Sequence, residues 1–487
     1  MRSRLDRVFS AITAGNEALG RKNRFLLLKI VWGVVLLLGL LRLLLPESLQ
    51  YSFTVMGGVL LSGLIALLSY EKGAFSGLRL CALPTLLVVG IGLCFLVNAL
   101  VFRVLAYFAI GMLFAVGLPL LYLCLFSFGP ESSILAFAEG TGAAFVLVLI
   151  ASLLFGPVVG DSGYASFFGN TNLFGYFLIA STAAILLLLY TTEAERRGRK
   201  SVLYCLLFIA LTLCVLTRSR TSLLSVLAQL LFYFVTWCVR AAKNKSLALT
   251  WAAFCRRLVL FALIVVTTFT AFCPLKIYAA RQILRHTDEA AAAAFEKEQP
   301  TSEEILRLTF AYLFKGLGAS EDDEASEDDE DLLDEPGTEA LDDEDVFTSG
   351  RKEIWKRFYH ELRFLGHADE TLEVVEKTRH YAATNAHNVY LQLAFSAGIP
   401  AGLLMLLLAL LVFVSTAVRV LREYRAASLS LPNLFLGLSG LAFAFPSLTS
   451  AGYMPYVYYP ATLFWVSLML LCVRSEKMEF AYNQEAR

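Results

Sequence analysis

The side chains best suited to chemistry lie between Thr384 and Gly402, where a polar segment ends and an apolar helix is predicted to begin. His387 and Asn388 stand at this boundary, and Tyr390 follows them. A histidine at the mouth of a membrane helix is partly hydrated, and the ordinary pKa of histidine is about 6.5, so it could act as a base or as a hydrogen-bond donor. The alternative is that His387 and Asn388 only begin a helix at the level of the lipid headgroups, and these residues alone leave both interpretations open.

Two arginines and two asparagines lie in short connections between other apolar runs. Arg218 and Arg220 occupy the minimal turn 217–222, where they are costly unless they reach lipid phosphates or bind another anion. Asn170 and Asn172 precede a further apolar run, in a segment rich in glycine and aromatic residues that suits a tight turn at a membrane interface. The alternative for the arginines is snorkelling to lipid phosphates, and the alternative for the asparagines is an ordinary turn, so both pairs stay candidates.

The composition is that of a polytopic membrane protein. The 487 residues are 57% hydrophobic and only 17% charged, and the mean hydropathy is +0.65. A soluble protein has roughly 25% charged residues and could not keep this much apolar surface from water. The nine cysteines lie mostly inside apolar runs without a CxxC pair, so we interpret them as core residues rather than as disulfides or zinc ligands.

The hydropathy pattern predicts an all-α protein with about twelve transmembrane helices, since most apolar runs approach the ~20 residues that a bilayer requires. The weakest boundary is the short connection at Phe102 and Arg103. The predicted spans are 25–45, 51–69, 80–100, 104–128, 141–160, 173–190, 201–217, 221–239, 258–275, 388–418, 432–451 and 455–473.

Lysine and arginine distribution predicts the orientation of these spans. Positive clusters lie in the N-terminal lead 1–24, at 196–200, at 240–257 and at 419–425, and an even number of spans places all of them in the cytoplasm. The N-terminal lead and the tail 474–487 are then both cytoplasmic. The domain of spans one to nine is 25–275, and that of spans ten to twelve is 388–473.

A large segment, 276–387, then faces the outside between spans nine and ten. Within residues 276–386 there are 28 acidic and 13 basic residues, and the remaining chain has the reverse. Residues 321–345 contain 16 acidic residues and no basic one, which predicts a disordered insert. Residues 351–363 predict a basic interfacial helix whose apolar face includes Trp355 and Phe358. No metal-binding spacing is present among the five histidines, so no metal or other cofactor is expected.

The order of motifs from about Asn170 to Leu411 resembles the O-antigen ligase and polymerase superfamily of bacterial membrane glycosyltransferases. N-T-N precedes one span and T-R-S-R-T opens another, and a large outer loop follows. That loop closes with S-G-R-x-E-I-W, F-L-G-H and T-N-A-H-N-x-Y-L-Q, and G-I-P-x-G comes next. Members commonly have an acidic residue before this last turn, where the present chain has Ser396 and Ala397, and the acidic insert is a further departure.

The resemblance implies transfer of a glycan from an undecaprenyl-diphosphate carrier to a lipid or glycan acceptor. The outer segments contain no D-x-D metal motif outside the acidic insert, so we expect the transfer to be metal-independent and inverting. The reaction would take place at the outer face of the bacterial plasma membrane, and no nucleic acid partner is expected. The catalytic residues implied are His387, Arg220 and Arg351, and the substrate-binding residues are Arg218, Asn170, Asn172, Asn388 and Tyr390.

Two other classes of function stay open at this point. Twelve spans also suit a transporter of bicarbonate or another solute, although coupled transporters place ionisable residues at mid-membrane and the predicted spans contain few of them. A non-catalytic scaffold of the cell envelope is the other alternative. The motifs do not distinguish a ligase from a polymerase, and they do not identify the sugars.

Overall fold

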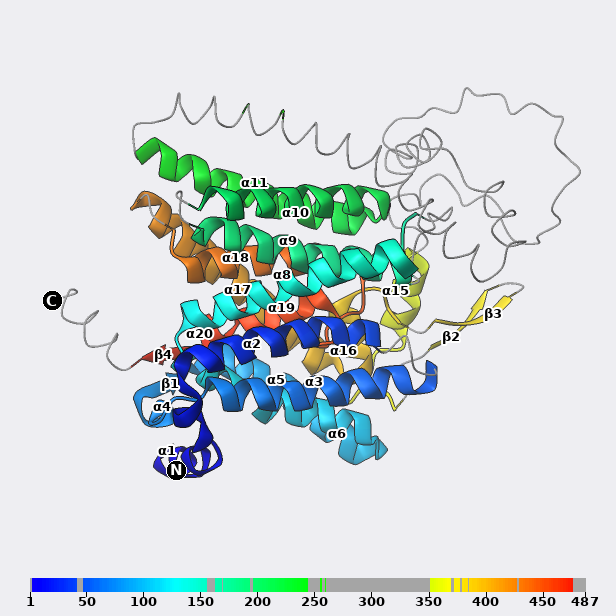
Figure 1. Cartoon of the computed structure of the whole chain (residues 1–487). Helices are drawn as coiled ribbons and strands as arrows, with labels where there is room; N and C mark the ends of the chain where they lie inside the picture. Colours follow the sequence, from blue (N-terminus) through cyan, green and yellow to red (C-terminus); the bar gives the residue numbers. More distant parts are fainter. Residues whose placement is uncertain are drawn as a thin grey trace, which may run out of the picture.

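The computed structural model describes residues 2–41, 47–155, 163–168, 170–192, 196–243, 255, 259, 351–368, 372–376, 379–383, 385–426 and 429–475. These residues are mostly helical and form a bundle (Figure 1). The predicted ninth span 258–275 and the acidic insert 321–345 lie outside the described residues, apart from Val259.

The elements follow one another along the chain in this order. The first half contains α1 (Arg2–Ile12), α2 (Gly15–Leu41), α3 (Glu47–Ser69), α4 (Ala74–Gly77), β1 (Leu78–Leu80), α5 (Ala82–Phe102), α6 (Leu105–Met112), the π-helical turn η2 (Leu113–Gly117), α7 (Leu118–Ser127), α8 (Pro130–Phe155), the 3-10 turn η3 (Ser166–Phe168), α9 (Thr171–Thr191), α10 (Arg197–Leu216) and α11 (Arg220–Lys243). The second half contains α15 (Arg351–His360), β2 (Leu372–Glu376), β3 (Arg379–Ala383), α16 (Val389–Ser396), α17 (Ile399–Arg425), α18 (Leu431–Thr449), α19 (Tyr459–Ser467), α20 (Met469–Cys472) and β4 (Val473–Ser475).

Eight helical stretches of the described chain are long and apolar enough to cross a membrane. They correspond to the third to eighth, tenth and eleventh predicted spans. The predicted boundary at Phe102 is confirmed, because α5 ends there and Arg103 adopts the left-handed conformation with a φ of 59° before α6 begins. The structure therefore confirms a polytopic, mostly helical membrane protein, whereas the total of twelve spans stays a prediction.

Three of the predicted spans differ from the structure. The span 141–160 begins earlier than predicted, because α8 starts at Pro130. The span 388–418 is not one helix, because Gly398 breaks it into α16 and α17. The span 455–473 begins later than predicted, because Tyr456 has a φ of 71° and Pro460 is compatible only with the first turn of α19. Two small antiparallel sheets, β1 with β4 and β2 with β3, add strands that the all-α prediction did not contain.

The helix α9 lies at the centre of the bundle. Every residue from Phe174 to Leu189 is buried, and the helix contacts α8, α10, α11, α18 and α19. A membrane helix that lipids do not cover is surrounded by protein on all sides. The N-terminus of α9 is therefore held in a fixed position relative to the surrounding helices.

The two ends of the bundle have different contents. Figure 1 shows α15, α16, β2 and β3 at one end, and α1, β1 and β4 at the other. The second end also contains the start of α10 and the ends of α11 and α17, which carry the basic clusters assigned to the cytoplasm (Figure 1). All the predicted site residues are thus at one end and the basic clusters at the other, as the charge pattern predicted.

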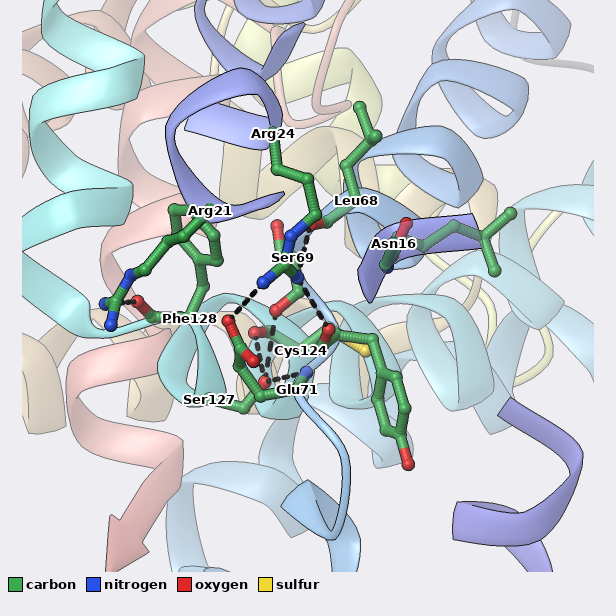
Figure 2. A network of polar contacts seen from close by, with 11 residues as sticks. Asn16, Arg21, Arg24, Leu68, Ser69, Glu71, Cys124, Ser127 and Phe128 are labelled. Atoms are coloured by element: carbon green, nitrogen blue, oxygen red, sulfur yellow. Dashed lines mark hydrogen bonds and ion pairs between the residues drawn. The ribbon is translucent and has the colours of Figure 1, made fainter. Parts of the chain in front are cut away.

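Two arginines of the N-terminal lead bind helix ends at the basic end of the bundle. Figure 2 shows the buried Arg24, which donates to the carbonyl oxygen of Tyr70 at 3.0 Å and to Glu71 Oε1 at 2.7 Å. Arg21 donates to the carbonyl oxygen of Phe128 at 2.7 Å (Figure 2). These carbonyls close α3 and α7, and cations at helix C-termini are favoured by the helix dipole. The arginines therefore also fasten α2 to α3 and α7.

Replacing Arg24 by Ala should lower the free energy of unfolding by about 1.5–3 kcal/mol, because charged hydrogen bonds to buried groups are lost. Arg21→Ala is the matched control: it removes one hydrogen bond from an exposed side chain and should cost less. The measurement is the thermal unfolding midpoint in detergent. Equal midpoints for the two variants would show that the Arg24 contacts contribute no more to stability than the single Arg21 hydrogen bond.

Candidate functional site

The N-T-N turn is joined to the T-R-S-R-T turn by a direct side-chain contact. Asn170 caps α9, because its Oδ1 accepts from the backbone N–H of Asn172 at 2.9 Å and of Leu173 at 3.1 Å. Ser219 Oγ donates to Asn172 Oδ1 at 2.8 Å. Asn170 thus serves as a helix cap, the ordinary role in the sequence analysis, whereas Asn172 holds the start of α9 beside the start of α11.

The two arginines of the second turn occupy different environments. Arg218 follows the C-terminus of α10, has a φ of 55° and is only 4% exposed. Arg220 opens α11 and is partly buried. The segment before α9 packs against the end of α10 beside this turn, since the backbone N–H of Tyr164 donates to the carbonyl oxygen of Leu216 at 2.8 Å. Both guanidinium groups are therefore held in a protein environment rather than spread on a surface.

His387 lies in a backbone conformation that non-glycine residues seldom adopt. Its φ is 46°, and its N–H donates to Asn385 Oδ1 at 3.1 Å. Asn388 caps α16 by accepting from the N–H groups of Tyr390 and Leu391, each at 3.0 Å. Gln392 accepts from the Ala386 N–H at 2.8 Å. These contacts fix the backbone on both sides of His387.

The helix α15 brings Arg351 to the same region. Phe358 is fully buried and makes an edge contact with Phe395 of α16, with ring centroids 4.7 Å apart. The predicted helix is present, but its apolar face packs on protein, whereas the sequence predicted contact with lipid. Burial and the positive charge of Arg351 both lower the pKa of His387, with burial the larger cause. Arg351 and His387 are therefore electrostatically coupled.

Hydroxyl groups from α18 lie between these elements. Thr449 Oγ1 is 3.0 Å from Thr221 Oγ1 of α11, and the Tyr390 hydroxyl is 3.3 Å from Ser447 Oγ. The buried Tyr176 of α9 interacts with Ser450 and Thr449 and with the charge of Arg351. The sequence analysis missed these residues. The available signal was the run P-S-L-T-S at the end of an apolar span and a tyrosine one turn after N-T-N.

The F-L-G-H motif packs directly against the break between α16 and α17. The Ile399 N–H donates to the Arg363 carbonyl at 3.1 Å, and the His367 ring stacks on Phe395 with centroids 4.0 Å apart. Gly366 and Gly398 have φ values of 78° and 97°. A Cβ on Gly366 would clash with the Ser396 oxygen, and one on Gly398 would clash with the Phe364 oxygen, so both positions require glycine.

Asn98 of α5 anchors this contact from the membrane side. Its side chain is fully buried, and Nδ2 donates to the carbonyl oxygen of Ser396 and, at 3.4 Å, to that of His367. Both acceptors belong to backbone that packs around the break. Asn98 therefore connects a distant membrane helix to the segment that carries His387.

The resulting site combines positive charge with hydroxyl groups. Arg218 and Arg220 and the N-termini of α9 and α11 lie in one part, and Arg351, His387 and the N-terminus of α16 in the other, with the end of α18 contacting both. Helix N-termini and arginines both favour anions, above all phosphates. In the described part of the chain, no three His, Cys, Asp or Glu side chains gather as a potential metal site.

Comparison with known families supports this description. A family model described as O-antigen ligase matches residues 205–407, which is less than half of the chain. The match includes the arginine turn, α15, α16 and the break before α17, and it confirms the resemblance drawn from the motifs. No curated protein and no solved structure matches the chain significantly.

Asn98→Ala should destabilise the protein by about 1–3 kcal/mol, because the buried carbonyl of Ser396 and the partly buried carbonyl of His367 lose a donor. Val97→Ala is the matched control: this side chain is exposed on the same helix and should have little effect. Thermal unfolding in detergent measures the difference. Similar midpoints for both variants would contradict the anchoring role of Asn98.

Proposed function

With residues 205–407 assigned to the O-antigen ligase family, we propose that the protein transfers a glycan from an undecaprenyl-diphosphate carrier to a lipid or glycan acceptor. The reaction takes place at the outer face of the bacterial plasma membrane. The observation that carries the proposal is the gathering of three arginines, four helix N-termini and a histidine of lowered pKa at the same end of the bundle.

The arginines suit a lipid diphosphate. As the glycosidic bond to the carrier breaks, negative charge grows on the diphosphate oxygens, and preorganised cations lower the energy of that state. A guanidinium group binds two phosphate oxygens at once and keeps its charge even when buried. We assign Arg220 and Arg351 to the reacting diphosphate, and Arg218 to binding of the same group. Asn172 and Tyr390 stay candidates for contacts to the sugar.

His387 suits the role of general base. Its lowered pKa keeps the imidazole uncharged at neutral pH, and only the uncharged ring can accept a proton. In the proposed step, the acceptor hydroxyl gives its proton to His387, and its oxygen forms a bond to the anomeric carbon. The bond from that carbon to the diphosphate oxygen breaks, and the carrier leaves as the diphosphate. A single displacement of this kind inverts the anomeric configuration.

The central test is the pH dependence of transfer from purified lipid-linked donor. The acid limb of kcat/KM should lie below the ordinary histidine pKa of about 6.5, since the pKa of His387 is lowered and the reactive form exists above it. Arg351→Gln removes one cause of the lowering, so the pKa rises and the acid limb should move to higher pH. Arg351→Lys keeps the charge and should leave the limb in place while losing activity through the missing guanidinium fork.

His387→Ala should lower the rate by roughly 10²–10⁴-fold, the usual contribution of a general base. His387→Gln distinguishes a general base from a hydrogen-bond donor, because glutamine donates a hydrogen bond but is a poor base. The Gln variant should retain much of the activity only if His387 acts as a donor. Protein levels must be matched in the membrane. Near-normal product from His387→Ala would remove this residue from the mechanism, and an unmoved acid limb in Arg351→Gln would remove the coupling to Arg351.

The orientation can be tested by cysteine labelling in a chain lacking its nine native cysteines. Tyr359→Cys, on the exposed side of α15, should react with an impermeant reagent in intact cells. Gly198→Cys and Lys243→Cys, at the basic end, should react only after permeabilisation, as expected from the distribution of Lys and Arg. The opposite pattern would place the candidate site in the cytoplasm and exclude the proposed reaction at the outer face.

A further inference from the structure

A second concentration of arginines lies at the end of the bundle opposite the candidate site. A cavity of about 410 Å³ is present there, between the start of α5, the stretch of α17 from Leu411 to Arg419 and the β1–β4 sheet. Arg79, Arg419 and Arg474 line it, together with leucines that include Leu83 and Leu411. Figure 1 places β1 and β4 at this end. None of these residues belongs to the family motifs or to the proposed reaction.

The three arginines lie close to one another and carry like charges. Arg79 and Arg474 are directly paired in the antiparallel β1–β4 sheet, so their side chains leave the same face. Like charges in this position destabilise a strand pair. Arg419 is partly buried beside them, in the field of Arg474, and donates to the carbonyl oxygen of Leu470 at 3.2 Å. That hydrogen bond positions the guanidinium without neutralising it.

The acidic residue one helical turn from Arg419 on α17 also binds the start of α18. Glu423 follows Arg419 by one helical turn, and its negative charge interacts electrostatically with the Arg419 guanidinium. Its carboxylate, however, accepts from the N–H of Ser430 at 2.7 Å and from the Ser430 hydroxyl at 2.9 Å, at the start of α18. Three arginines therefore line the cavity, and the carboxylate that interacts with Arg419 also binds the start of α18.

We propose that this cavity binds a phosphate-bearing anion, held by Arg79, Arg419 and Arg474. Basic pockets between membrane helices on the cytoplasmic side suit anionic headgroups. The adjoining surface favours a phospholipid as the source, since Leu83 and Leu86 on α5 are 58% and 65% exposed beside the cavity. Acyl chains could cover these leucines while arginines hold the headgroup phosphate, which joins the two observations in one ligand.

The test is native mass spectrometry of the purified full chain with added phosphatidylglycerol or phosphatidylcholine, with binding of inorganic phosphate measured separately. Phosphatidylglycerol should stay bound more strongly than phosphatidylcholine. Arg419→Gln and Arg474→Gln should each weaken it by roughly tenfold, the effect of losing a charge-assisted hydrogen bond. Arg422→Gln is the matched control, because this arginine lies on the same helix end, is exposed and does not line the cavity.

Each outcome decides the proposal. Binding of phosphatidylglycerol that falls in the two variants but not in the control supports a headgroup site. Binding of inorganic phosphate alone, with the same dependence on Arg419 and Arg474, supports the anion site with a soluble ligand and excludes the lipid. Equal binding of both lipids, or unchanged binding in both variants, overturns the proposal. Arg474 is exposed in a three-residue strand, so its variant tests binding even if Arg419→Gln fails to fold.

Discussion

The break between α16 and α17 is the constraint on which the candidate site depends. Gly398 turns the chain with a φ that favours glycine, and the loop carrying Gly366 enters so closely that neither position accepts a Cβ. Asn98 satisfies backbone carbonyls on both sides of this contact. Because α16 is thereby separated from the long helix α17, it can present His387 at the edge of the bundle and receive α15 on its other side.

Backbone strain is concentrated near this edge. Of the five non-glycine residues with positive φ in the described chain, Arg218 and His387 are both predicted site residues. A left-handed conformation costs roughly 1–2 kcal/mol for an ordinary residue, so surrounding contacts must hold each of them there. The Asn385 hydrogen bond and the Gln392 contact to Ala386 do this for His387. The energetic cost of these two backbone conformations is consistent with selection for the position of the Arg218 and His387 side chains rather than for the stability of the fold.

Hydropathy and charge could predict most helices and the separation of the two ends, because spanning a bilayer depends only on length and apolarity. The break at Gly398 was missed since apolar residues continue through it, although Gly398 and Pro400 together were an available signal. The contacts of Asn98 and Tyr176 join helices far apart in sequence, and the three-residue pairing of β1 with β4 spans almost the whole chain. No local pattern encodes such contacts.

The arginines at the two ends differ in their relation to helix dipoles, and this difference bears on which of them would serve the proposed reaction. Arg21 and Arg24 bind carbonyl groups at helix C-termini, where a cation is stabilising, and Arg218 also follows a C-terminus. Arg220 and Arg351 instead open α11 and α15, where the positive end of the dipole disfavours a cation. A bound anion would reverse that cost at both positions. Local stability therefore explains Arg218 better than Arg220 or Arg351, which leaves the last two as the stronger candidates for contact with the departing diphosphate.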